Sequence, residues 1–213
     1  MFNLSQTNSI ANTFIAELRD ENIQKDSMRF RKNLERLGAF FAYEVSKTLT
    51  YTAADIQTPL GISQCMVLNE QPVIATILRA GLPMQQGLLS VFDRAECAFI
   101  TAYRKTKKSG DFIIQMEHIS APDLAGKTVI LADPMLATGL SMVLCAKELI
   151  GRYAIKKLHI VCAIASTEGI KHVKANLPKA ELWIGAIDEE MTSKSYIVPG
   201  LGDAGDLSYG EKA

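Results

Sequence analysis

The sequence lacks several features that would assign a function class directly. No excess of charge marks its 213 residues, because 23 Lys and Arg are balanced by 23 Asp and Glu. Such a chain is not built to coat nucleic acid, although a local basic loop is compatible with it. No apolar run approaches membrane-spanning length, and the N-terminus does not resemble a signal peptide. We therefore expect a cytoplasmic protein that binds neither nucleic acid nor membranes.

Residues that would mark a metal centre or a covalent catalyst are also scarce. The four cysteines, Cys65, Cys97, Cys145 and Cys162, form no C-x-x-C pair, and three lie in apolar runs, which is typical of reduced, buried thiols. The three histidines have no metal-ligand spacing, and neither G-x-S-x-G nor H-E-x-x-H occurs. The sequence thus favours a reducing compartment and assigns no metal ligand directly.

Hydrophobic periodicity predicts an α/β fold. Apolar residues spaced three and four apart between Met28 and Leu49 indicate an amphipathic helix, and a break follows at residues 58–61. From residue 72 onward, near-continuous apolar runs alternate with helical segments, as in a parallel sheet that helices cover on both faces. Strands are predicted at residues 73–78, 97–103, 127–132, 158–165 and 181–187, and helices at 82–94, 140–151 and 167–176.

We interpret residues 1–213 as one domain with three parts. Residues 1–57 are expected to form an N-terminal helical extension, residues 72–190 the α/β core, and residues 191–213 a C-terminal segment. The strand-like stretch 111–119 follows a charged loop and is expected to form a small antiparallel arm. Because ligands of open α/β sheets bind at the carboxyl ends of the strands, the residues that follow each strand are the candidates for a site.

The first candidate is LADPMLATGLS, residues 131–141. A strand that ends on Asp133 and leads through a turn with Thr138, Gly139 and Ser141 into a helix suits a phosphate, because hydroxyls, backbone N–H groups and the helix dipole favour a dianion. Asp133 suits sugar hydroxyls or a magnesium ion. An ordinary Thr or Ser N-cap is the alternative, and the segment alone does not decide between the two.

Two further segments offer cations. In residues 78–84, Arg79 precedes Ala80 and Gly81 and can present its guanidinium to a phosphate, although an ordinary strand-to-helix turn explains this segment better when it is taken alone. Residues 101–111 form either a solvated loop or a lid that closes on a polyanion. The cations of this loop are Arg104, Lys105, Lys107 and Lys108.

The glycine-rich segment 196–210 contains two misleading matches. Three of its glycines fit the dinucleotide-binding fingerprint, but the helix and the distal acid that this motif needs have no room after them. A second stretch approaches a P-loop but lacks its lysine. What is left is a loop with backbone donors and acceptors beside Tyr196 and Asp203, suited to a small planar polar ligand. A floppy tail is the alternative.

Together these segments resemble the uracil phosphoribosyltransferase family. Residues 133–141 are similar to its loop for 5-phospho-α-D-ribose 1-diphosphate (PRPP), with Pro134 in place of the second acid of most phosphoribosyltransferases. Residues 77–84 are similar to its pyrophosphate loop, and residues 196–206 to its uracil-binding segment. The likeness begins near Met28 and continues to the C-terminus in the family's order.

The resemblance implies a fold, a reaction and partners. The fold is a type I phosphoribosyltransferase-like parallel sheet flanked by helices, with N-terminal helices and a C-terminal hood loop. The reaction transfers the phosphoribosyl group of PRPP to N1 of uracil and gives UMP and diphosphate, in pyrimidine salvage. Mg²⁺ is the implied cofactor, carried by PRPP. A homodimer or larger homo-oligomer and a GTP effector are also implied, although no site for GTP is legible in the residues.

The resemblance also assigns roles position by position. The catalytic residues are Asp133, Arg104 and Asp203. The PRPP-binding residues are Arg79, Ala80, Gly81, Arg104, Asp133, Pro134, Met135, Leu136, Ala137, Thr138, Gly139, Leu140, Ser141 and Asp203. The uracil-binding residues are Tyr196, Ile197, Gly202, Asp203 and Ala204, acting largely through backbone groups. Backbone groups that match N3–H and O4 of uracil would be left unpaired by cytosine, which inverts the pattern.

Two residues depart from the family pattern. Leu140 stands where a second glycine is usual, and Leu207 where arginine is frequent. We expect Leu140 to begin a helix at negative φ with its side chain turned away from the phosphate. Two alternatives stay open: a ligand-sensing protein on the same fold, and a phosphoribosyltransferase for another base. Turnover of uracil with PRPP distinguishes them.

Overall fold

The computed structural model describes residues 1–106 and 112–212, with the backbone alone at residues 103–106 and 112–115. Its main sheet has the strand order β1-β10-β9-β7-β4-β5-β6, with β8 beside β9. All pairings in this sheet are parallel except that between β5 and β6. The strands are β1 (Phe2–Asn3), β4 (Val73–Leu78), β5 (Cys97–Thr106), β6 (Phe112–Ser120), β7 (Thr128–Ala132), β8 (Met135–Leu136), β9 (Lys157–Ser166) and β10 (Glu181–Asp188).

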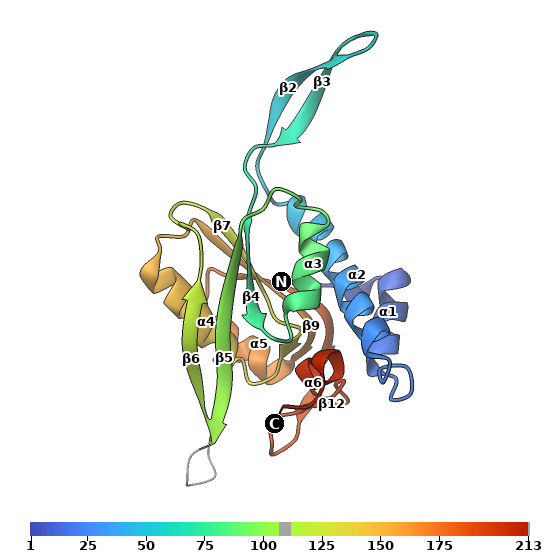
Figure 1. The fold of residues 1–213 in the computed structure, drawn as a ribbon, viewed down its shortest axis with the longest axis vertical. Coiled ribbons are helices and arrows are strands. Elements are labelled where there is room, and N and C mark those ends of the chain that lie inside the picture. Colours follow the sequence, from blue (N-terminus) through green and yellow to red (C-terminus); the bar gives the residue numbers. More distant parts are fainter. Residues whose placement is uncertain (107–111, 213) are drawn as a thin grey trace.

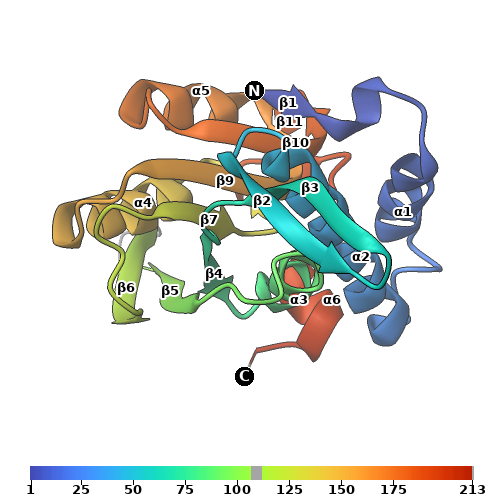
Figure 2. The same cartoon turned by 90° about the horizontal axis from the view of Figure 1, so that it is seen from above.

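Helices cover both faces of this sheet (Figure 1, Figure 2). The helices α1 (Ile10–Arg19), α2 (Ser27–Ser46) and α3 (Leu82–Leu89) pack on one face, and α4 (Leu140–Arg152) and α5 (Thr167–Asn176) on the other. Successive strand residues alternate between the two cores: Ile74 and Ile130 face the first, and Val73 and Val129 the second. This double burial explains why the strands are almost continuously apolar.

The structure confirms the predicted α/β class and all of the predicted strands, with ends that differ by a few residues at most. The helix expected at residues 28–49 is α2, which ends at Ser46, and the antiparallel arm expected at residues 111–119 is β6. The helix predicted for residues 82–94 is too long, because α3 ends at Leu89. Beyond it, the N–H groups of Val91 and Phe92 both bond to the carbonyl of Leu88, so the chain turns away instead of adding a helical turn.

The prediction that residues 1–57 form a helical extension is wrong for residues 51–57. Tyr51–Thr58 form strand β2, which pairs antiparallel with β3 (Gly61–Leu68), so the break read at residues 58–61 is a hairpin turn. The hairpin projects from the body of the molecule (Figure 1). Since most of its residues are exposed on both faces, it carries no alternation of apolar and polar residues by which a strand is recognised.

Among the described residues, no helix is both long and apolar enough to cross a membrane. The longest helix, α2, has charged residues along one side and packs its apolar side against α3 and the sheet.

A buried histidine lies at the start of β9. The Nδ1 atom of His159 accepts a hydrogen bond from Nε1 of Trp183 at 3.0 Å, and the side chain is fully buried. Burial and the nearby charge of Lys157 lower the pKa of His159 from 6.5 to about 4, against the opposing effect of Glu181. The ring is therefore neutral at neutral pH.

Acid should destabilise the protein through His159. Because its folded-state pKa is below its ordinary value of 6.5, the unfolded chain takes up the proton first, and stability is lost as the pH falls from 6.5 toward 4. The loss is at most about 3 kcal/mol. Urea unfolding at about pH 7 and about pH 4.5 measures it. His159→Gln keeps an acceptor for Trp183 without titrating and should lose less stability. Equal losses in both proteins would contradict the assignment.

Candidate active site

A cavity of about 870 Å³ opens at the carboxyl edge of the sheet. The ends of β4 and β7, the start of α4 and the C-terminal segment contribute its walls. The predicted site residues that line it are Arg79, Ala80, Asp133, Met135, Leu136, Ala137, Thr138, Gly139, Ser141, Tyr196, Ile197, Gly202, Asp203 and Ala204. Three of the four segments found in the sequence therefore line one cavity. The fourth, residues 101–111, contributes Thr101 and Ala102 to the lining, and the side chains of its basic residues lie outside the part of the chain that the structure describes.

Four predicted residues are not among those that line the cavity. Gly81 packs against the sheet, where a Cβ would lie 2.1 Å from Oγ1 of Thr76. Pro134 is buried behind the loop. Leu140 points to solvent. The side chain of Arg104 lies outside the described residues, as do Lys107 and Lys108.

The turn before α4 has the geometry of an anion site. Gly139 is the N-cap at φ +77°, and Oγ1 of Thr138 accepts a hydrogen bond from the N–H of Leu140 at 3.3 Å. The first N–H groups of a helix have no partner within it, and the helix dipole makes this end partly positive. These donors and the hydroxyl of Ser141 lie at the cavity wall. The arrangement suits a phosphate group.

Leu140 behaves as predicted. The left-handed residue of the turn is Gly139, and among the described residues Ser195 is the only non-glycine with positive φ. Leu140 is the first residue of α4, is 42% exposed and does not line the cavity. A second glycine is not required at this position, so the departure from the family pattern leaves the loop intact.

The turn is supported by residues at the start of α5. The helix was predicted from the sequence, but its contact with the turn was not. Oγ of Ser166 donates to the carbonyl of Ala137 at 2.6 Å and accepts from the N–H of Gly169 at 2.8 Å. A Cβ on Gly169 would lie 2.2 Å from the same carbonyl. Both residues are far from the turn in sequence, and a small residue beside a helix N-cap is too common a signal to have identified them.

Asp133 follows β7 at the cavity wall and is half-buried. Its Oδ1 accepts from the N–H of Met135 at 3.3 Å. Burial raises the pKa of the Cys145 thiol to about 12, and the charge of Asp133 adds to this. The same two causes raise the pKa of Cys162. Because both thiols are buried and stay protonated, neither is suited to act as a nucleophile.

Arg79 connects the end of β4 to the C-terminal segment. Its Nη2 donates to Oδ1 of Asp206 at 3.1 Å and to the carbonyl of Gly210 at 3.0 Å. The guanidinium lies at the cavity wall, so the same group is placed to meet an anionic ligand. Asp206 was not identified from the sequence, because its partner lies more than a hundred residues away.

The C-terminal segment is ordered, which excludes the floppy tail. Strand β11 (Glu190–Met191) pairs with β12 (Ile197–Val198), and a short helix, α6 (Ala204–Tyr209), follows. Asp203 caps α6 by accepting from the N–H groups of Gly205 and Asp206 at 2.8 and 3.0 Å. The prediction of a plain glycine-rich loop is therefore wrong from residue 204 onward, since the Asp cap starts a helix. Leu207 packs against the core.

No group of three His, Cys, Asp or Glu side chains among the described residues is arranged to hold a metal ion. Three residues with carboxylate side chains line the cavity, namely Asp133, Asp203 and Glu211. Mg²⁺ commonly binds through one or two carboxylates together with substrate phosphates and water. The residues present thus fit a magnesium ion that arrives with a phosphorylated ligand.

The sequence was next compared with known proteins. The model of one protein family, described as uracil phosphoribosyltransferase, matches residues 5–210. The chain belongs to the uracil phosphoribosyltransferase family. A curated uracil phosphoribosyltransferase from Porphyromonas gingivalis is 47% identical over 100% of this chain and 99% of its own length. One from Thermococcus gammatolerans is 39% identical over 92% and 87%.

A solved protein from Aquifex aeolicus has the same fold. The TM-score is 0.86 at 30% identity, with 96% of both chains covered. The match to the family model, over residues 5–210, also includes α1 and α6, which lie outside the α/β core.

Gly169 offers a test of how α5 shapes the turn before α4. Gly169→Ala improves helix propensity, but its Cβ would meet the carbonyl of Ala137 at 2.2 Å, so we expect a loss of about 1–3 kcal/mol in stability. Gly151→Ala is the matched control in α4, where nothing lies within 4 Å, and it should stabilise by about 0.5 kcal/mol. Urea unfolding measures both. A stabilised Gly169→Ala variant would show that the turn yields easily.

Proposed function

We propose that this protein transfers the phosphoribosyl group of PRPP to N1 of uracil, giving UMP and diphosphate. The observation that carries the proposal is one cavity that joins an anion-binding helix start, a strand-end carboxylate and a backbone-rich C-terminal segment. These three features match the three chemical parts of the reactants, namely the 5-phosphate, the ribose and the base. Family membership supports the same reaction.

Each wall of the cavity has a part in the proposed reaction. The turn from Ala137 to Ser141 binds the 5-phosphate, and Asp133 holds the ribose hydroxyls. Arg79 and Arg104 bind the diphosphate and stabilise the charge that builds on it as its bond to C1 breaks. N1 of uracil attacks C1 as it gains oxocarbenium character, and the N1 proton leaves with diphosphate or water. Mg²⁺ bound with PRPP neutralises part of the diphosphate charge.

Uracil is selected through the backbone of the C-terminal segment. The residues proposed to surround the base all line the cavity, namely Tyr196, Ile197, Gly202, Asp203 and Ala204. A carbonyl that accepts from N3–H and an N–H that donates to O4 fit uracil, whereas cytosine leaves both groups unpaired. We further propose that the protein works in the cytoplasm, a reducing compartment in keeping with its four free cysteines. GTP as an effector is part of the proposal through the family resemblance alone.

Turnover with uracil, PRPP and Mg²⁺ tests the function. We expect UMP from uracil and none of the corresponding products from cytosine or a purine base. PRPP binding without turnover would favour the ligand sensor, and turnover with a purine alone would favour another phosphoribosyltransferase. The assay with and without GTP tests the effector.

Two variants test the residues. Asp133→Asn and Arg104→Ala should each lower turnover by about tenfold or more, because each removes a charge that contacts PRPP. Asp93→Asn and Arg94→Ala remove like charges from exposed positions outside the cavity and serve as matched controls. Unchanged rates in both test variants would show that these residues do not have the proposed roles.

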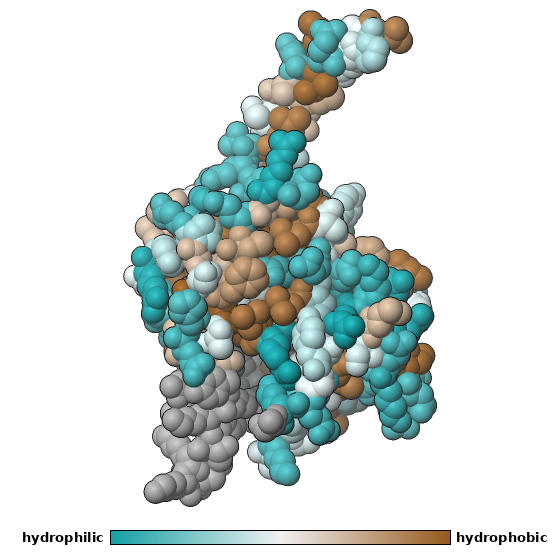
Figure 3. Space-filling model, in the orientation of Figure 1, coloured by the Kyte–Doolittle hydropathy of each residue, from teal (hydrophilic) through white to brown (hydrophobic). Residues whose placement is uncertain are grey.

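We also propose that the protein forms a homodimer through the β2–β3 hairpin. Its exposed apolar side chains project from the body (Figure 3), and Asp55 is the one charged residue among residues 51–68. A two-stranded hairpin is marginal by itself and gains stability when an apolar surface covers it. In a two-fold symmetric dimer the hairpin of each copy packs against the same surface of the other copy. Both hairpins are therefore covered in one interface. The exposed apolar residues are Tyr51, Ile56, Leu60, Ile62 and Met66.

The oligomeric state of hairpin variants tests the proposed dimer interface. Sedimentation should show a dimer for the wild type and a shift toward monomer when Ile62 and Met66 are both replaced by aspartate, since charges resist burial. Ile150→Asp is the control, because Ile150 is equally an exposed apolar residue but lies on α4. A monomeric wild type, or a double variant that stays fully dimeric, would contradict the proposed interface.

A further inference from the structure

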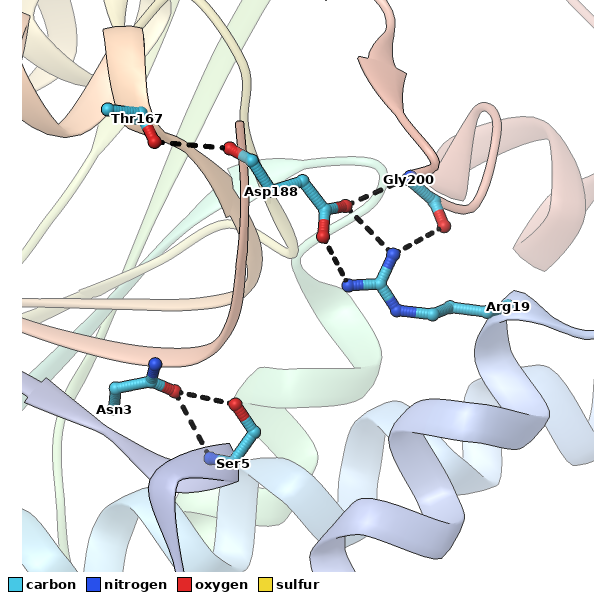
Figure 4. Close-up of polar contacts among 6 residues, drawn as sticks. All are labelled: Asn3, Ser5, Arg19, Thr167, Asp188 and Gly200. Carbon is cyan, nitrogen blue, oxygen red and sulfur yellow. Dashed lines mark hydrogen bonds and ion pairs between the residues drawn. The ribbon is translucent and has the colours of Figure 1, made fainter. Parts of the chain in front are cut away.

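The proposed uracil segment has a fixed point that does not line the cavity. Gly200 lies between Ile197 and Gly202, which both line it. Both polar backbone groups of Gly200 bond to one ion pair (Figure 4). The N–H donates to Oδ2 of Asp188 at 2.9 Å, and the carbonyl accepts from Nη1 of Arg19 at 2.9 Å. The segment is thus attached at its middle.

The ion pair is itself rigidly built. Nη1 and Nη2 of Arg19 donate to Oδ2 and Oδ1 of Asp188 at 2.8 and 2.7 Å, which is the two-pronged geometry that fixes orientation as well as distance. Arg19 is the last residue of α1 and Asp188 the last of β10. The side chains are 22% and 6% exposed, so this pair is unlike a surface ion pair that water and salt weaken.

Gly200 has little freedom to adapt if the pair is lost. It adopts φ +55°, and a Cβ at this position would lie 2.2 Å from the carbonyl of Ile197. The turn is therefore tight, and only glycine fits it. Leu201, the next residue, is buried in the core, so the chain is held at two successive residues between the two groups that face the cavity.

We propose that Arg19 and Asp188 are positioning residues for uracil, which act through Gly200 to set the backbone that reads the base. The inference rests on the proposed function. Recognition through backbone groups depends on where the chain lies, and a shift of a fraction of an ångström misaligns donor and acceptor. The N-terminal helix α1 thereby takes part in base binding although none of its residues lines the cavity.

The central variant is Arg19→Lys. Lysine keeps the positive charge beside Asp188 but has one ammonium in place of a planar fork, so it cannot hold both Asp188 and the carbonyl of Gly200 in the same geometry. We expect the KM for uracil to rise about tenfold while the KM for PRPP stays unchanged. An ion pair that only stabilises the fold would lower the melting temperature without separating the two KM values.

The matched control is Arg29→Lys. Arg29 also anchors α1, through Nη2 and Nε hydrogen bonds to Glu17 at 2.5 and 3.0 Å. If loosening α1 were enough, this variant would raise the KM for uracil as well. Among the described residues no hydrogen bond or ion pair joins Arg29 to residues 191–212, so we expect both of its KM values to stay at the wild-type level.

Asp188→Asn changes the other residue of the ion pair. It provides a second test if Arg19→Lys does not fold. It should give the same selective rise in the KM for uracil. A wild type that turns over uracil, with an unchanged KM for uracil in the folded variants, would overturn this inference alone. A wild type that does not turn over uracil would overturn the proposed function, and the inference with it.

Discussion

Parallel pairing of β4, β7, β9 and β10 is the constraint on which the rest of the structure depends. Parallel strands deliver their carboxyl ends to one edge, so Arg79, Asp133 and Asp188 meet there although long stretches of chain separate them. The same pairing requires crossovers that cover both faces, which produces two cores and strands that are apolar on both sides. The position of the cavity and the layout of the helices thus have one cause.

The C-terminal segment depends on the rest of the molecule for its shape. It contains a six-residue helix and a two-residue strand pair, too little regular structure to hold itself. Three arginines from earlier elements attach it. Arg19 bonds to Gly200, Arg79 to Asp206 and Gly210, and Nη1 of Arg31 to the carbonyl of Ser208 at 2.6 Å. The position of the C-terminal segment, which contains the proposed base-binding residues, therefore depends on these hydrogen bonds.

Features with a strong local signal could be predicted from the sequence. The buried strands could, because both faces are apolar, and so could the turn at Thr138 and Gly139, because a strand end, small residues and a helix start follow one another. Ser166, Gly169 and Asp188 could not, since their partners are distant in sequence. The β2–β3 hairpin gave no pattern because little of it is buried. The assigned roles of individual residues came from family resemblance rather than from periodicity.

The pairing of β1 with β10 has a consequence for how the protein is made. Phe2 of β1 lies opposite Trp183 of β10. The edge strand β1 therefore cannot pair until β10, one of the last strands in the sequence, has been synthesised. On a ribosome, β4 to β9 can assemble, and α1 can pack against α2, while β1 still lacks its partner strand. Arg19 in turn meets Asp188 only after β10 has emerged. The end of the cavity formed by the C-terminal segment is thus the last part of the protein to fold.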